Sequence, residues 1–137
     1  MGGTQYTVLV TQLNQFPKDQ ENNIVRLLSL THSNSTGTLV PLDTDPVILL
    51  GDFGWASQTA YINLASIYTD SFESVGNGTG FTFPLKSPNV RRDFIYFSAP
   101  QNNLIPHQSF VETVSFDPAF ISDHSPVSTI FNLTSSN

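Results

Sequence analysis

The chain has 137 residues, of which 39% are hydrophobic and 12% aromatic, as expected of one globular domain with a single core. Its formal net charge is -6 and it has only five lysine and arginine residues, which argues against a surface that binds nucleic acid through many phosphate contacts. Because there is no cysteine, disulfide bonds, zinc–thiolate sites and thiol catalysis are excluded. No apolar run approaches the roughly 18 residues of a membrane-spanning helix, so no membrane span is predicted.

The N-terminal part of the chain predicts strands and helices in alternation. Residues 6–13 are rich in β-branched side chains and predict a strand. Pro17 follows, at a position that the first turn of a helix tolerates, and Ile24, Leu27, Leu28 and Thr31 then recur at helical spacing. The polar stretch 32–44 predicts a surface loop. The continuous apolar run 46–50 predicts a strand that is buried on both faces. Ser57 can then cap a second helix.

The C-terminal part predicts mainly strands, because β-branched and aromatic residues are concentrated there. The predicted strands cover residues 80–83, 92–98, 108–116 and 126–133. Strand, helix, strand, helix and then several strands predict a mixed α/β or α+β layer. The segment 93–97 is apolar on both alternating faces, so its sheet needs cover on both sides, whereas the two predicted helices cover only one.

Asp52 and Asp93 are the first candidates for a functional site. Asp52 follows an apolar strand and a glycine, at the carboxyl edge of a sheet, where ligand crevices tend to form. Asp93 begins an apolar strand, where a carboxylate must be paired or hydrogen-bonded. Each also has a purely structural interpretation. Asp52 can cap the following helix or turn, and Asp93 can be the ion-pair partner of Arg91 or Arg92.

His124 is the third candidate. It follows Asp123 just before the last predicted strand, which places an acid and an imidazole at another strand edge. Histidine changes its charge near neutral pH and therefore suits proton transfer, and a nearby carboxylate can orient its ring. An Asp-His dipeptide alone is a weak signal, because most such pairs are solvated turns.

Four motifs, however, occur in order along the chain. They are Gly-Asp-Phe at 51–53, Gly-Phe-Thr-Phe-Pro at 80–84, Arg-Arg-Asp-Phe-Ile-Tyr at 91–96 and Ser-Asp-His-Ser-Pro-Val at 122–127. Together they resemble the endonuclease/exonuclease/phosphatase superfamily, in which Gly-Asp-Phe-Asn, Arg-Ile-Asp-Tyr-Ile and Ser-Asp-His-Arg-Pro recur in this order. A Gly-Tyr-Thr-Phe-Pro stretch is also common there before the second motif. The resemblance runs from Tyr6 to Leu133, nearly the whole chain.

The resemblance implies a particular fold. The superfamily domain is a four-layer αββα sandwich, in which two sheets pack face to face between helices. This chain corresponds to its C-terminal half: one mixed, mostly antiparallel sheet covered by helices on one face. Residues 1–137 are accordingly expected to form a single partial domain whose N-terminal half is missing.

The resemblance also implies a metal-dependent phosphoesterase that uses Mg²⁺ or Mn²⁺ to hydrolyse phosphate mono- or diesters. His124 matches the imidazole that contacts the phosphate or activates water. Asp123 matches the carboxylate beside it, a catalytic and metal-binding position. Asp93 matches the carboxylate that orients a catalytic imidazole. Asp52 matches the carboxylate that helps to position water or the leaving group, and it is the second predicted metal ligand.

Three further positions are predicted to contact substrate: Arg92, Gly54 and Gln12. Two of them depart from the family pattern. Gly54 replaces an asparagine that usually contacts the phosphate, and Gln12 replaces a histidine in a segment that also has Asn14 in place of an aspartate. The principal metal-binding glutamate of the family belongs to the half that would precede Tyr6.

Three hypotheses follow. The first is a phosphoesterase domain that acts on a phosphate ester of unknown class and needs its missing half, or a second chain, to cover the sheet. The second is a non-catalytic interaction module derived from the same fold, which Gly54 and Gln12 favour. The third is an unrelated α/β domain in which the motifs coincide by chance.

Overall fold

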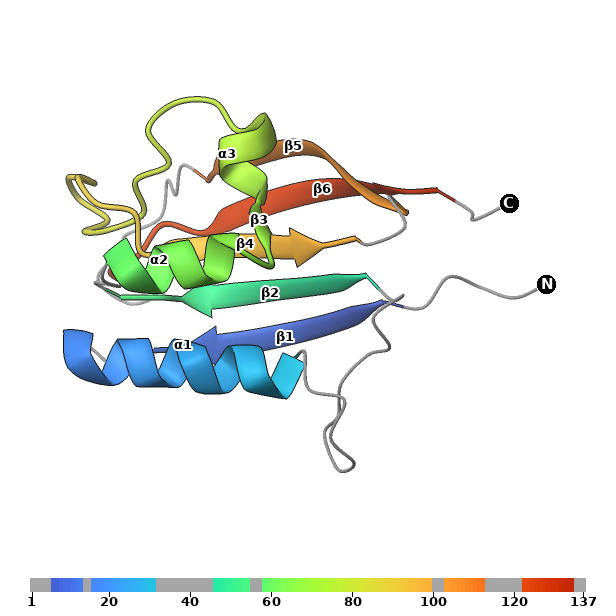
Figure 1. The fold of residues 1–137 in the computed structure, drawn as a ribbon. Helices are drawn as coiled ribbons and strands as arrows, with labels where there is room; N and C mark the ends of the chain where they lie inside the picture. The colour runs from blue at the N-terminus through green and yellow to red at the C-terminus, as the bar shows by residue number, and fades with distance from the viewer. Residues whose placement is uncertain are drawn as a thin grey trace.

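A computed structural model shows the fold of the protein (Figure 1). The first described element is a strand, and the last two are an antiparallel pair of strands. The described residues are 6–13, 16–31, 46–54, 58–99, 103–112 and 122–134. The predicted loop at 32–44, the predicted cap at Ser57 and the position of Asn14 lie outside them. The elements are β1 (Thr7–Gln12), α1 (Pro17–Thr31), β2 (Val47–Asp52), α2 (Gln58–Ala65), β3 (Thr69–Asp70), α3 (Ser71–Val75), β4 (Asp93–Ser98), β5 (Leu104–Val111) and β6 (Val127–Leu133).

The strands form two sheets. A four-stranded sheet has the order β1-β2-β4-β3, in which β1 is parallel to β2 while β4 is antiparallel to both β2 and β3. Strands β5 and β6 form a separate antiparallel pair. The predicted class, a mixed and mostly antiparallel α/β arrangement, is confirmed. Within the described ranges no helix is long and apolar enough to cross a membrane.

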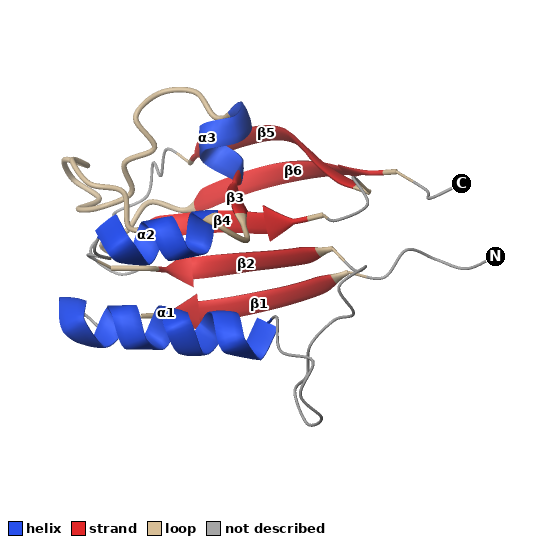
Figure 2. Ribbon diagram, viewed as in Figure 1, coloured by secondary structure: helices blue, strands red, loops and turns tan. Residues whose placement is uncertain are grey.

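One face of the four-stranded sheet packs against helices α1 and α2, as Figure 2 shows. Alternation along the strands turns Leu49 and Phe94 toward these helices, where they are buried together with Ile24 and Leu64. Phe53 is fully buried, with its ring 5.7 Å from that of Phe94 in an edge-on geometry. These buried side chains belong to the hydrophobic core, which lies between the sheet and the two helices. Burying one such side chain stabilises the fold by roughly 1.5–3 kcal/mol.

The opposite face of the sheet remains open. Strand register places Val8, Ile48 and Phe97 in one row across β1, β2 and β4. The next row on the same face consists of Val10, Leu50 and Ile95. Val8 is 48% exposed and Val10 is 74% exposed. No helix in the described part of the chain packs on this face (Figure 2). The predicted one-sided helix cover is therefore present, and an apolar surface remains on the other side.

Buried hydroxyl groups join the two sheets. Ser71 lies at the start of α3, and its Oγ is 2.8 Å from Oγ1 of Thr129 on β6. The same Thr129 Oγ1 is 2.8 Å from Oγ of Ser109 on β5. Ser71 and Ser109 are almost completely buried. Each hydroxyl therefore satisfies its neighbour where water cannot reach, which fixes the β5–β6 pair against the rest of the fold.

The strand predicted at residues 80–83 is wrong. Only an isolated bridge between Phe83 and Val90 is present there. The N–H groups of Thr82 and Phe83 both donate to the carbonyl of Val90, so the chain folds back on itself instead of pairing with a neighbouring strand. The strand predicted at 108–116 begins earlier, at Leu104, and its last part lies outside the described residues.

Candidate active site

Asp52 and Asp93 are brought together by the register of the sheet. Asp52 is the last residue of β2, Asp93 is the first residue of β4, and the two are antiparallel partners. Gly51 makes this strand end possible: it has a φ of 147°, and an added Cβ would lie 1.7 Å from the carbonyl oxygen of Thr11 on β1. Only glycine allows this close backbone approach, which fixes where Asp52 projects.

A backbone hydrogen bond orients the Asp52 side chain. The N–H of Gly54 donates to Asp52 Oδ1 over 2.7 Å, so the carboxylate caps its own turn. Asp52 therefore does cap the turn that follows β2, as its purely structural interpretation predicts. It does not exclude a further role, because a carboxylate has about four acceptor positions.

His124 reaches the same strand end from the turn before β6. Its Nδ1 lies 2.7 Å from Asp93 Oδ2, and the two side chains are 17% and 20% exposed. A carboxylate only accepts, so Nδ1 carries the proton and donates a hydrogen bond to Asp93. In the neutral ring this leaves the lone pair on Nε2, which is the atom available to a reacting group. The ion-pair alternative for Arg91 is not realised, since Arg91 pairs with Asp70.

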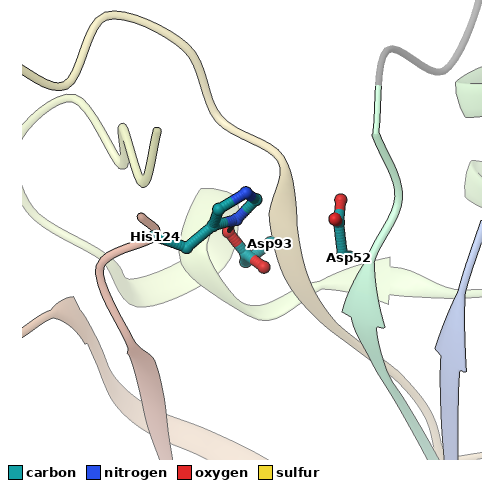
Figure 3. A group of neighbouring side chains, drawn as sticks. All are labelled: Asp52, Asp93 and His124. Carbon is teal, nitrogen blue, oxygen red and sulfur yellow. Dashed lines mark hydrogen bonds and ion pairs between the residues drawn. The ribbon is translucent and has the colours of Figure 1, made fainter. Parts of the chain in front are cut away.

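Asp52, Asp93 and His124 form a compact group of possible metal ligands (Figure 3). One ligand atom from each lies within 4.8 Å of the others. Two carboxylates suit Mg²⁺ or Mn²⁺, and Mg²⁺ typically binds through one or two carboxylates and retains several waters. The donor set therefore fits a divalent cation.

The other predicted residues surround this group at different distances. Asp123 is 79% exposed, with Oδ1 3.9 Å from His124 Nε2, and it is not one of the three residues in the compact group. Gln12 is the register partner of Asp52 on β1, so it extends the row of polar residues across the sheet. The Arg92 guanidinium stacks on the ring of Phe83, 3.8 Å from its centroid. Their roles in metal or substrate binding stay predictions.

Residues 82 and 83 were assigned no role from the sequence, although the structure places both against the site. Thr82 is fully buried beneath the start of β4, and the ring of Phe83 lies 4.9 Å from that of His124. Their signal in the sequence is the motif at residues 80–84, which by itself indicates no function.

A cavity lies on the helix side of the sheet. It has a volume of about 480 Å³ and its lining includes Tyr61, Tyr96, Asp70 and Arg91. Burial raises the pKa of Tyr96 well above its usual range, with a smaller contribution from the Asp70 carboxylate. Asp52, Asp93 and His124 are not among the residues that line this cavity.

The fold and this strand end define an α/β half-sandwich with a histidine–carboxylate group at one end of its sheet. No protein-family model and no curated protein sequence matches the chain. Solved structures do match. A conserved protein of unknown function from Enterococcus faecalis V583 has a TM-score of 0.73 and 20% identity, over 93% of this chain and 50% of its own.

Two further matches carry a family or an activity in their descriptions. An endonuclease/exonuclease/phosphatase family protein from Bacteroides thetaiotaomicron has a TM-score of 0.68 and 20% identity, over 90% of this chain and 48% of its own. A mannosyl-6-phosphatase from Bacteroides thetaiotaomicron VPI-5482 has a TM-score of 0.62 and 20% identity, over 90% of this chain and 50% of its own. The chain therefore has the fold of endonuclease/exonuclease/phosphatase proteins and spans about half the length of these structures, which confirms the predicted resemblance at the level of fold.

Proposed function

We propose that this chain is part of a metal-dependent phosphoesterase that hydrolyses a phosphate mono- or diester at the strand end occupied by Asp52, Asp93 and His124. The observation that carries the proposal is the 2.7 Å contact between His124 Nδ1 and Asp93 Oδ2, with Asp52 alongside. It combines an oriented imidazole with carboxylates suited to a divalent cation. The likeness in fold to a mannosyl-6-phosphatase supports the phosphate-ester class.

Each residue at this strand end has a separate role in the proposed reaction. Asp93 holds the proton on His124 Nδ1, which leaves the Nε2 lone pair to accept a proton from the attacking water. In the protonated ring, Nε2–H would instead donate a hydrogen bond to the phosphate. Asp52 would supply a carboxylate oxygen to the cation, and Asp123, exposed beside His124, is the second ligand that the sequence predicts. When bound, Mg²⁺ or Mn²⁺ would polarise the phosphoryl oxygen and stabilise the negative charge that develops on it. Arg92 offers a fixed positive charge to the anionic substrate.

The site also requires a complementary half. The chain spans about half the length of its structural matches, and the open face with Val8 and Val10 leads to the row that contains Asp52 and Asp93. We infer that the other half of the sandwich, or a second chain, covers this face during turnover. Burying these exposed valines would favour association through the hydrophobic effect.

A second candidate function is a non-catalytic interaction module. Gly54 has no side chain to contact a phosphate, and its N–H is already bonded to Asp52. Gln12, beside Asp52, carries an amide that cannot transfer a proton near neutral pH. Both features favour binding without turnover.

The two candidates are separated by an assay of the chain together with a separately expressed complementary half. Hydrolysis of p-nitrophenyl phosphate, bis(p-nitrophenyl) phosphate and mannose 6-phosphate is measured with Mg²⁺ and with EDTA. The enzyme proposal predicts turnover that depends on Mg²⁺ and that falls at least about 100-fold in His124→Ala. His107→Ala, at an exposed position on β5, is the matched control and should retain activity. Equal turnover in wild type and His124→Ala would remove this residue from the mechanism, and association without turnover would favour the interaction module.

A further inference from the structure

We propose that Thr82 and Phe83 are positioning residues that fix Asp93, Arg92 and His124 relative to one another, an inference that rests on the proposed function of the site. Both residues lie in the segment between α3 and β4, within the motif at 80–84. The contact between Asp93 and His124 joins residues 31 positions apart in sequence, so something must align their two backbone segments.

Thr82 provides the first link. Its side chain is fully buried, and its Oγ1 accepts hydrogen bonds from the backbone N–H groups of Arg92 and Asp93 over 3.1 and 3.2 Å. Its carbonyl oxygen accepts from the N–H of Ser125 over 2.7 Å. One residue therefore joins the backbone at Asp93 to the residue that follows His124. A buried residue with two side-chain bonds and one backbone bond of this kind leaves little freedom for the two segments to slide.

A second link lies on the other side of His124. The N–H of Leu85 donates to the carbonyl of Asp123 over 2.7 Å. Both neighbours of His124 are thus hydrogen-bonded to the segment that contains Thr82 and Phe83. The position of the imidazole follows from these bonds, because the backbone on each side of His124 is held.

Phe83 acts on the side chains themselves. Its ring lies 4.9 Å from the His124 ring at an interplanar angle of 54°, and the Arg92 guanidinium carbon lies 3.8 Å from its centroid. The Phe83 backbone is in turn fixed by reciprocal hydrogen bonds with Val90, of 3.0 and 3.1 Å. A guanidinium on an aromatic face loses rotamer freedom, so Phe83 holds a cation and an imidazole at set positions for one anionic group.

A purely structural role predicts different behaviour. If Thr82 only fills space, the isosteric change Thr82→Val should preserve the geometry of His124, and stability alone should respond. If Thr82 positions Asp93, Thr82→Val leaves two N–H donors without their acceptor and shifts the carboxylate, whereas Thr82→Ser keeps the hydroxyl. Likewise, Phe83→Leu keeps an apolar side chain and removes the aromatic face, whereas Phe83→Tyr keeps that face.

The test is the tautomer ratio of His124, read from long-range ¹H–¹⁵N correlation spectra of the full chain, with thermal unfolding in parallel. In wild type we expect the Nδ1–H form to dominate. In Thr82→Val its ratio to the Nε2–H form should fall at least about tenfold, as expected when a hydrogen bond to a charged group is lost. Thr82→Ser should restore the ratio. Thr129→Val removes another partly buried hydroxyl, away from His124, and should change stability without changing the ratio. An unchanged ratio in folded Thr82→Val would overturn the role of Thr82.

Phe83 is tested with inorganic phosphate as the probe. Phe83→Leu should weaken phosphate binding by about three- to tenfold and remove the ring-current shift of the Arg92 side-chain protons, and Phe83→Tyr should restore both. If Thr82→Val does not fold, this pair of variants decides the inference, and equal phosphate affinity and equal shifts in Phe83→Leu and wild type would overturn it. The ring-current and tautomer readouts need neither turnover nor bound phosphate. A wild-type chain that shows the expected tautomer but binds no phosphate, even together with its complementary half, would therefore contradict the proposed function and leave the positioning inference standing.

Discussion

Asp52 and Asp93 face each other across β2 and β4 at the point where one strand ends and the other begins. Their carboxylates have different partners, because Asp52 accepts from the Gly54 N–H and Asp93 contacts His124. Like charges directly opposite each other destabilise a sheet. A divalent cation bound beside the two carboxylates would offset this repulsion.

Asp52→Asn should separate cation binding from folding. Asparagine keeps the Oδ1 acceptor for Gly54 and removes one charge from the facing pair. Without metal we expect the variant to be at least as stable as wild type. With Mn²⁺ at about 100 times its dissociation constant, wild type should gain about 2.7 kcal/mol of unfolding free energy, and the variant should gain little. Thermal unfolding with and without Mn²⁺ measures both. Glu112→Gln, at an exposed carboxylate just after β5, is the control, and an equal gain in Asp52→Asn and Glu112→Gln would contradict the assignment of Asp52 as a ligand.

Gly51→Ala should be among the most damaging substitutions in the chain. Its φ of 147° disfavours alanine, and the new methyl group would lie 1.7 Å from the carbonyl oxygen of Thr11. Backbone strain and overpacking together predict a loss of about 3–5 kcal/mol in urea unfolding. Gly78→Ala also has a positive φ, 91°, but nothing lies within 4 Å of its added Cβ, so a loss of about 1 kcal/mol is expected. Equal losses would show that the close approach to Thr11 relaxes easily.

The sequence predicted the first four main elements well, because their patterns are local. The apolar run 46–50 and the β-branched segment 6–13 became β2 and β1, and helical spacing placed α1 and α2 between and after them. The short elements β3 and α3 were not predicted. The Asp70 side chain accepts hydrogen bonds from Phe72 and Glu73, but a single cap and a five-residue helix leave almost no periodic signal.

The partners of charged residues could not be read from the sequence. Arg91 was considered as a partner for Asp93, two residues away, and the structure pairs it with Asp70, 21 residues away. Which charge meets which depends on the packing of α3 against the sheet, a tertiary property. The approach of Asp93 to His124 was implied only by family resemblance, because 31 residues separate them and no local pattern links them.

Arg91→Met should destabilise the fold strongly. Arg91 donates two hydrogen bonds of 2.7 Å to Asp70, and the side chains are only 13% and 7% exposed. Removing the arginine leaves the Asp70 carboxylate buried with one charge uncompensated, which costs about 3–5 kcal/mol. Urea denaturation measures the loss. Arg26→Met on the exposed side of α1 should change stability by less than about 0.5 kcal/mol. A loss below about 1 kcal/mol in Arg91→Met would mean that this pair behaves like a surface ion pair.

Val10→Asp should leave the isolated chain folded but prevent it from binding the complementary half of the sandwich. Val10 is 74% exposed on the open face, so a charge there remains solvated, and we expect a loss of no more than about 1 kcal/mol. If the complementary half of the sandwich packs on this face, the same carboxylate becomes buried in an apolar interface, and binding should weaken at least about 100-fold. Fluorescence anisotropy with a labelled complementary half measures the affinity. Val25→Asp on α1, where the valine is 57% exposed on the other side of the molecule, should bind normally. Equal binding by Val10→Asp and Val25→Asp would show that the partner does not cover the open face, and the proposed route to a complete active site would then fail.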